Sequence, residues 1–162
     1  MIPSKISTER LTLLHLTNTH PSHPHVQLFH ENWSNLTATA WSLRGATKSL
    51  EESREWMIES LDRFDSYFYA VFARYAFFPA AWGRGYGTEA NRGLLNAYSA
   101  AVGQQSGGKG RGYVEAAVDD ENAGSLALIQ KLGFERVGWR ESEKVWLNGG
   151  WREGYWVYGL HI

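Results

Sequence analysis

The fold of this chain can be read from one stretch, Trp82-Gly83-Arg84-Gly85-Tyr86-Gly87-Thr88-Glu89. Three glycines alternate with a cation and an aromatic residue, and helix-forming residues follow at once. Glycine adopts backbone conformations that other residues avoid, and it leaves room for a ligand close to the main chain. N–H groups at the start of a helix are free to bind anions, phosphates above all. The stretch therefore predicts a turn that holds a phosphate at the N-terminus of a helix.

Length and composition are those of one soluble globular domain, which we expect to span residues 1–162. The chain is 43% hydrophobic and 20% charged, with a formal net charge of −1. That charge argues against binding nucleic acid through bulk electrostatics. The absence of cysteine excludes disulfides, thiolate metal sites and a cysteine nucleophile. No apolar run reaches the length of a bilayer, and the first residues lack an apolar signal core, so we expect a cytoplasmic protein without membrane contact.

Apolar periodicity predicts strands alternating with helices. The expected elements are strands at 10–17, 67–73, 75–78 and 112–118, helices at 25–36, 49–63, 88–102 and 122–132, and a hairpin over 134–162 that turns at 148–150. Ser49 and Glu52 form a capping box, Gly103 should end its helix, and the strand at 112–118 should be buried on both faces. This order implies one mixed sheet with a parallel crossover around the helix at 88–102.

Three histidines, His20, His23 and His25, cluster in a turn-rich segment and raise the question of a metal site. Two prolines and the absence of nearby carboxylates favour a plain loop instead. We therefore assign no metal ligands.

The glycine turn alone is weak evidence, because a tight connection with positive φ angles explains it equally well. A dinucleotide-binding fingerprint needs different spacing and a position at the first strand-to-helix turn, and a P-loop needs G-x-x-x-x-G-K-[ST]. A second motif adds more specific evidence. About 35 residues later comes Asn122-Ala-Gly-Ser125-Leu-Ala-Leu-Ile-Gln-Lys131-Leu-Gly133-Phe134.

In this order and spacing the two motifs resemble those of the GCN5-related N-acetyltransferases (GNAT superfamily), and especially the branch of ribosomal-protein N-terminal acetyltransferases. Arg10-Leu-Thr-Leu fits the first strand of that family, and Asn148-Gly-Gly-Trp-Arg fits its last hairpin. The resemblance covers most of the chain. It implies an α/β fold in which helices flank a mixed, mostly antiparallel central sheet that is splayed at the cofactor site.

The resemblance also implies acetyl-CoA as co-substrate. The turn and the following helix would bind the diphosphate of coenzyme A, and the pantetheine arm would lie beside the strand before the turn. Arg84 adds charge or is simply solvated, and Asn122 contacts the cofactor or only caps its helix. The implied cofactor-binding residues are Phe77, Phe78, Trp82, Gly83, Arg84, Gly85, Tyr86, Gly87, Thr88, Asn122, Ser125 and Lys131.

Acetyl transfer to an amine requires deprotonation of the amine, stabilisation of an oxyanion and reprotonation of the thiolate. A backbone N–H at 76–79 is the family-like candidate for the oxyanion. Ser125 stands where relatives place a hydroxyl near the sulfur, although it could instead bond local backbone. For the base we consider Glu143, where some relatives carry a carboxylate, and Glu115, whose apolar strand could raise its pKa. Either glutamate could instead be the partner of an arginine.

One departure from the family concerns the sheet. Relatives carry a further strand between the segments that correspond to 67–73 and 75–78, whereas here Arg74 is followed directly by Tyr75. A strand with its turn needs on the order of ten residues. Three explanations remain open: an unresolved segment missing from the sequence, a shortened transcript or gene model, and a truly abbreviated sheet. We favour the first two.

The sequence thus predicts an acetyl-CoA-dependent N-acetyltransferase acting on a primary amine of a protein N-terminus or a small molecule. A non-catalytic acyl-CoA-binding protein of the same fold is the alternative, and a nucleotide-binding protein is a more distant one. Trp33, Trp41, Tyr67 and Trp139 are candidates to line an acceptor pocket, although most aromatic residues should belong to the core. The identity of the acceptor and the oligomeric state, a homodimer included, stay open.

Overall fold

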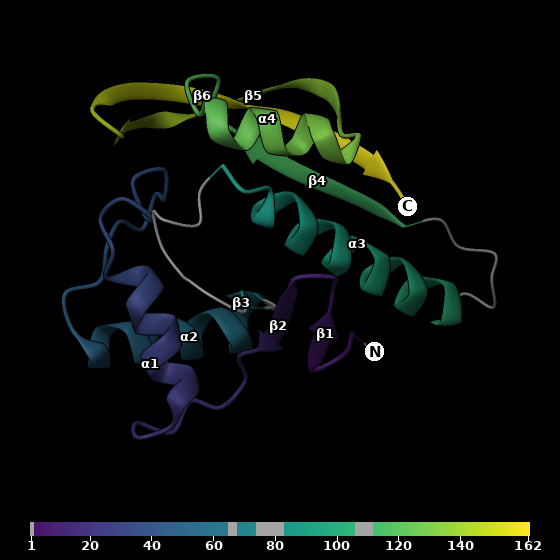
Figure 1. Ribbon diagram of the computed structural model, residues 1–162. Coiled ribbons are helices and arrows are strands. Elements are labelled where there is room, and N and C mark those ends of the chain that lie inside the picture. Colours follow the sequence, from purple (N-terminus) through teal and green to yellow (C-terminus); the bar gives the residue numbers. More distant parts are fainter. Residues whose placement is uncertain (1, 65–67, 74–82, 106–111) are drawn as a thin grey trace. The chain divides into compact units, whose positions relative to one another are not determined.

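The computed structural model describes residues 2–64, 68–73, 83–105 and 112–162 (Figure 1). Contacts divide the chain into two compact units. Unit 1 comprises Met1–Leu13, Val71–Lys144 and Arg152–Ile162, and unit 2 comprises Leu14–Ala70 and Val145–Trp151. Each unit has a hydrophobic cluster of its own. The expectation that 1–162 form a single domain stays a prediction.

The described elements confirm the expected mixture of helices and antiparallel strands. In chain order they are β1 (Lys5–Ser7), β2 (Leu11–His15), α1 (Pro24–Trp33), α2 (Leu50–Phe64), β3 (Tyr69–Ala73), α3 (Tyr86–Gln105), β4 (Tyr113–Val118), α4 (Ala123–Leu132), β5 (Glu135–Leu147) and β6 (Gly150–His161). They form two three-stranded sheets, ordered β1-β2-β3 and β4-β6-β5, and β4 pairs with β6 in antiparallel register. The strand expected at 75–78 and the join of Arg74 to Tyr75 lie outside the described residues.

Two sequence expectations are wrong in detail. Helix α3 does not end at Gly103 but continues to Gln105, since one glycine inside a helix costs only about 1 kcal/mol relative to alanine. Strand β4 is not buried on both faces. Its burial alternates, with Tyr113, Glu115 and Ala117 exposed, because successive side chains of a strand point to opposite faces.

In unit 2, helices α1 and α2 pack against each other around a small core. Its fully buried members are Leu16, Val26, Phe29 and Met57, and the rings of Trp33 and Trp56 pack against them. In α2 the apolar residue Leu50 is exposed, while the polar residues Ser53 and Ser60 are buried. Figure 1 shows the two helices in purple and blue.

The start of α2 shows the expected cap with a shift of one residue. The hydroxyl of Ser49 accepts the N–H of Glu52 at 3.1 Å, as a capping box requires. The carboxylate of Glu52 accepts the N–H of Lys48 at 2.7 Å rather than that of Ser49. This backbone hydrogen bond is the main reason why the pKa of Glu52 lies below its usual value.

In unit 1, α4 covers one face of β4 and β6. Val118, Ile129 and Tyr158 form the buried cluster, with Ala116 and Leu126 packed against it. Helix α4 ends at Gly133 in the left-handed conformation (φ 87°), as the sequence predicts. The hairpin of β5 and β6 turns at Asn148 (φ 47°) and Gly149 (φ 79°), a pair of positive φ angles typical of a type I′ turn. No helix among the described residues combines the length and the apolar character that a membrane span requires.

Candidate functional site

The glycine turn has the conformation that its composition predicts. Gly83 and Gly85 adopt positive φ angles of 73° and 77°, a region that residues with a side chain rarely enter. Gly87 has no positive φ angle, so the backbone conformation does not require a glycine at this position. The carbonyl of Gly85 accepts the N–H of Glu89 at 3.0 Å, which is the first hydrogen bond of α3. Gly85 therefore stands at the N-cap position of this helix.

Helix α3 differs from the other three described helices in how it begins. A side chain caps each of the others: His23 caps α1, Ser49 caps α2 and Asn122 caps α4. Gly85 has no side chain that could do the same for α3. The first N–H groups of any helix lack partners within the helix, and in α3 no N-cap side chain is available to satisfy them. The start of α3 is thus an open donor site suited to an anion.

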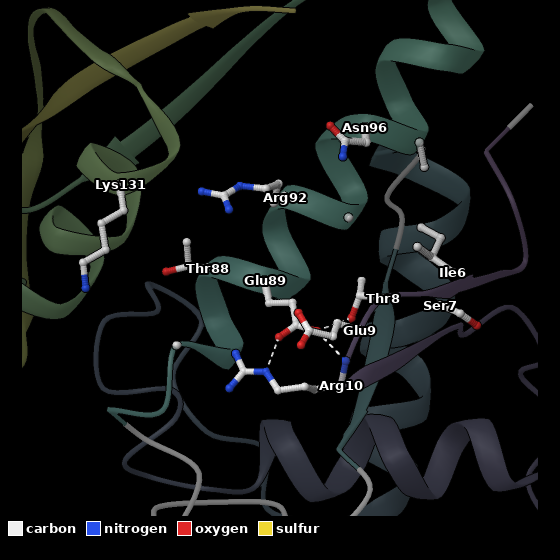
Figure 2. Close-up of a pocket in the computed structure, with 13 residues that line it drawn as sticks. Ile6, Ser7, Thr8, Glu9, Arg10, Thr88, Glu89, Arg92, Asn96 and Lys131 are labelled. Carbon is white, nitrogen blue, oxygen red and sulfur yellow. Dashed lines mark hydrogen bonds and ion pairs between the residues drawn. The ribbon is translucent and has the colours of Figure 1, made fainter.

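An arginine from the turn between β1 and β2 holds the glycine turn in place (Figure 2). The guanidinium of Arg10 donates through Nε to Glu89 at 2.6 Å and through Nη1 to the carbonyl of Arg84 at 3.1 Å. It also lies over the ring of Tyr86, 4.7 Å from its centroid. One planar side chain therefore connects the strand turn, the glycine turn and the first turn of α3.

Glu89 accepts two further hydrogen bonds that join α3 to the turn between β1 and β2. Its Oε1 accepts the hydroxyl of Thr8 at 2.5 Å and the N–H of Arg10 at 2.8 Å. Partial burial raises the pKa of the Glu89 carboxyl, but these hydrogen bonds and the charge of Arg10 outweigh it. The net result is a pKa below the usual value of 4.5.

A hollow of about 850 Å³ opens beside this contact. One side is formed by Ser7 and Thr8, and the other by α3 residues Thr88, Arg92 and Asn96. Lys131, in the last turn of α4, lines it as well (Figure 2). The hollow thus brings the predicted contacts Gly85, Thr88 and Lys131 together.

The start of α4 carries the second motif. The Oδ1 of Asn122 accepts the N–H of Ser125 at 3.1 Å, which confirms Asn122 as the cap. Arg152 fixes the preceding turn: its guanidinium lies 2.8 Å from the carboxylate of Asp119 and 2.6 Å from that of Glu121. Both Arg152 and Asp119 are largely buried in this ion pair. Ser125 is partly buried in the first turn of α4.

The two candidate bases lie in different surroundings. Glu115 projects from the face of β4 opposite α4, and its carboxylate pairs with Arg140 of β5 at 2.9 Å. It is therefore the partner of an arginine rather than a buried acid, and it does not share a face with Ser125. Glu143 lies exposed on β5, and the described residues give its carboxylate no ion pair.

The histidines near α1 have local structural roles. Nδ1 of His25 accepts the N–H groups of Thr17 and Asn18, and Nδ1 of His23 accepts the N–H of His25. Within the part of the chain that the structure describes, no three His, Asp or Glu residues are grouped so as to hold a metal ion.

Comparison with known proteins bears on this arrangement. Residues 61–135 match the model of the acetyltransferase (GNAT) domain. A probable GNAT acetyltransferase from Chromobacterium violaceum superposes with a TM-score of 0.68 at 17% identity, over 97% of this chain and 85% of that one. Spermidine N-acetyltransferase from Vibrio cholerae, in complex with CoA and spermine, gives a TM-score of 0.60 at 17% identity and 96% coverage of both chains. RimL, a ribosomal-protein acetyltransferase in complex with coenzyme A, gives 0.63 at 19% identity, over 99% of this chain and 97% of that one.

The chain has the fold of the GNAT acetyltransferases, and residues 61–135 match the model of their domain. No curated protein matches its sequence at a significant level. Phe77, Phe78 and Trp82, three of the cofactor contacts expected of a GNAT protein, lie outside the described residues. Of the aromatic candidates for the acceptor pocket, Trp33 packs against the core of unit 2, and Trp139 lies half-exposed against Trp156.

Sequence reasoning missed three of the residues that line the hollow beside α3: Arg10, Glu89 and Arg92. Arg92 could have been found, because it follows Thr88 by one helical turn and so shares its face. Arg10 and Glu89 are 79 positions apart, and nothing in either segment indicates that they pair. Only the tertiary fold brings these two side chains together.

Proposed function

We propose that this protein is an acetyl-CoA-dependent N-acetyltransferase that acylates a primary amine. The observation that carries the proposal is the open N-terminus of α3, which directly follows a glycine turn and has no N-cap side chain. The match of residues 61–135 to the model of the acetyltransferase (GNAT) domain supports the proposal. We further propose that residues 1–162 act as a single domain in the cytoplasm.

The residues present fit a diphosphate at the turn. Apart from its chain neighbours, no atom of the described residues lies within 4 Å of the position that a Cβ at Gly83 would take, so these residues leave room for an anion beside the main chain. The backbone N–H groups of Gly83 to Thr88 would hold the diphosphate of coenzyme A, with Arg84 adding charge, and Lys131 would contact the cofactor from the last turn of α4. Asn122 would contact the cofactor from α4, in addition to its observed role as a cap. Bound acetyl-CoA would supply an activated acetyl group as a thioester.

For the chemical step we propose that Ser125 donates a hydrogen bond to the thiolate that leaves. Of the two candidate bases we favour Glu143 over Glu115, because Arg140 already engages the carboxylate of Glu115. Removing a positioned acid or base typically slows a reaction on the order of 10²-fold or more. We therefore expect Ser125→Ala and Glu143→Gln to lower the reaction rate by a factor of this size, and Glu115→Gln to lower it less. Equal pH–rate profiles for both Gln variants and the wild type would exclude both glutamates as the base.

For the acceptor we propose a protein N-terminus or a small-molecule amine. The proteins of similar structure described above include examples of both classes. RimL acts on a ribosomal protein, and the Vibrio cholerae enzyme binds spermine. The net charge of −1 favours neither a strongly cationic nor a strongly anionic acceptor.

Thiol release from acetyl-CoA tests the proposal directly. The protein would be mixed with acetyl-CoA and a panel of peptides with a free α-amine, spermidine and an aminoglycoside. We expect release above background with at least one amine. Calorimetric binding of acetyl-CoA without release across the panel would instead support a non-catalytic acyl-CoA-binding protein. Absence of acetyl-CoA binding would refute both readings.

A further inference from the structure

Most basic side chains of the described residues are already engaged. Six arginines pair with carboxylates, and Arg136 lies over the ring of Trp156. The pairs are Arg10–Glu89, Arg44–Glu52, Arg54–Glu51, Arg63–Glu59, Arg140–Glu115 and Arg152–Asp119. In contrast, five other basic side chains have no ion pair within the described ranges: Lys5, Lys48, Arg84, Arg92 and Lys131.

Two of these five cations, Arg92 and Lys131, line the hollow beside α3. Figure 2 shows both side chains on the side of the hollow where Thr88 lies. Two carboxylates also line it, but Glu89 is held by Arg10, and Glu9 lies beside Thr8 at the turn between β1 and β2. Two positive side chains that share a hollow without a carboxylate partner form a site for an anion with more than one charge.

The position of Arg92 and Lys131 relative to the glycine turn limits which anion these two side chains can bind. Thr88, Arg92 and Asn96 follow one another at intervals of four residues, so they share a face of α3. At a rise of 1.5 Å per residue, the lined face runs about 12 Å along the helix, starting next to the turn. A ligand whose diphosphate occupies the turn would therefore extend its neighbouring group along this face.

In coenzyme A the diphosphate joins an uncharged pantetheine arm to an adenosine that carries a phosphate on its 3′-oxygen, so only the adenosine side can engage two cations. We infer that Arg92 and Lys131 bind this 3′-phosphate, so that the protein selects coenzyme A over dephospho-coenzyme A. This inference rests on the proposed function, and it adds a specificity determinant outside the glycine turn.

Calorimetry with coenzyme A and dephospho-coenzyme A tests the inference, because the two ligands differ only in that phosphate. We expect the wild-type protein to bind coenzyme A more tightly, on the order of tenfold for two exposed charge-assisted contacts. In the double variant Arg92→Gln/Lys131→Gln the two ligands should bind equally, each about as the wild type binds dephospho-coenzyme A. The preference of the wild type should also shrink as salt rises from about 50 mM to about 500 mM.

Two control variants separate this effect from a general loss of charge. Arg84→Gln removes a cation from the turn that does not line the hollow, and it should weaken both ligands by the same factor. Lys48→Gln removes one positive charge at the start of α2 and should change neither affinity. Thermal unfolding of each variant would show that it is folded, as expected for substitutions at exposed positions.

The experiment separates failure of this inference from failure of the proposed function. Binding of both ligands within a factor of about two by the wild type would overturn the inference and leave the proposed function standing. A preference retained in the double variant would overturn the assignment to Arg92 and Lys131. If the wild type binds neither ligand, the proposed function fails, and the inference fails with it.

Discussion

Arg10 and Glu89 show how two distant side chains can shape a loop that neither belongs to. Glu89 accepts three hydrogen bonds, from Thr8 and twice from Arg10, while Arg10 also binds the carbonyl of Arg84. Glycines at 83 and 85 permit the positive φ angles but do not select them, because glycine adopts many other backbone conformations as well. Ordering the turn therefore costs more conformational entropy at these two residues than it would at others. The guanidinium supplies the contacts that hold the turn in one conformation.

The charge of Glu89 should make stability depend on pH. Its pKa in the folded protein lies below the usual 4.5. Its contribution is therefore fully present above about pH 5 and is lost as pH falls through the folded-state value. We expect Glu89→Gln to lower the free energy of unfolding at pH 7 by about 1–2 kcal/mol, discounted for the exposure of Arg10. The deficit should shrink towards pH 3, as urea denaturation at several pH values would show.

Glu9 supplies the matched control for this experiment. It is a neighbouring carboxylate that lines the same hollow, and the described residues give it no hydrogen bond. Glu9→Gln should stay within about 0.5 kcal/mol of the wild type at every pH. A deficit of Glu89→Gln that does not vary with pH would contradict the role assigned to the charge.

Substitution of Arg10 should affect cofactor binding through the turn. Lysine keeps the charge but lacks the planar fork that reaches Glu89 and the carbonyl of Arg84 together. We expect Arg10→Lys to raise the Kd of acetyl-CoA several-fold with kcat at saturation nearly unchanged. Arg63→Lys, in an exposed pair with Glu59 on α2, should leave the Kd as it is. Equal affinity in Arg10→Lys and the wild type would show that the turn holds its shape without the guanidinium.

Among the elements, the β5–β6 hairpin leaves no room for a side chain at one of its glycines. A Cβ at Gly154 would meet the carbonyl oxygen of Arg140 and the ring of Trp139, both at 2.5 Å. A Cβ at Gly138 on the partner strand would have no atom within 4 Å. The two glycines stand in the same hairpin, and neither has a positive φ. Their different surroundings alone distinguish them.

Alanine at these two positions should therefore have different effects on stability. Gly154→Ala forces the backbone or the Trp139 ring to move and should cost about 1–3 kcal/mol in the free energy of unfolding. Gly138→Ala should be neutral or slightly stabilising, because it only restricts the unfolded chain. Urea denaturation measures both. Similar values for the two variants would mean that the hairpin adapts to a Cβ at Gly154.

For the chain as a whole, ligand binding should appear as thermal stabilisation. A ligand that binds only the folded state adds about 2.7 kcal/mol at a hundredfold excess over its Kd. For a chain of this length that corresponds to a rise in Tm of roughly 5–10 °C. We expect coenzyme A and acetyl-CoA to produce such a rise, and ATP to produce none. An equal rise with ATP would favour the nucleotide-binding alternative.

Most individual elements were predictable from local patterns. The cap at Ser49, the helix from Asn122 to Gly133 and the turn at Asn148-Gly149 depend on neighbours a few residues away, and all three are confirmed. Burial was less predictable. Glu115 was expected in an apolar environment, yet it lies on the exposed face of β4 and pairs with Arg140, because partners in a sheet come from distant parts of the chain.

By itself the sequence determined that this chain has a GNAT fold and where its glycine turn lies, because glycine conformations, helix caps and motif spacing are local properties. Only the tertiary structure decided which side chains complete that site. The pairing of Arg10 with Glu89, and the hollow that Arg92 and Lys131 share, join segments far apart in the chain. Such contacts depend on how the elements pack in three dimensions, which no local pattern encodes.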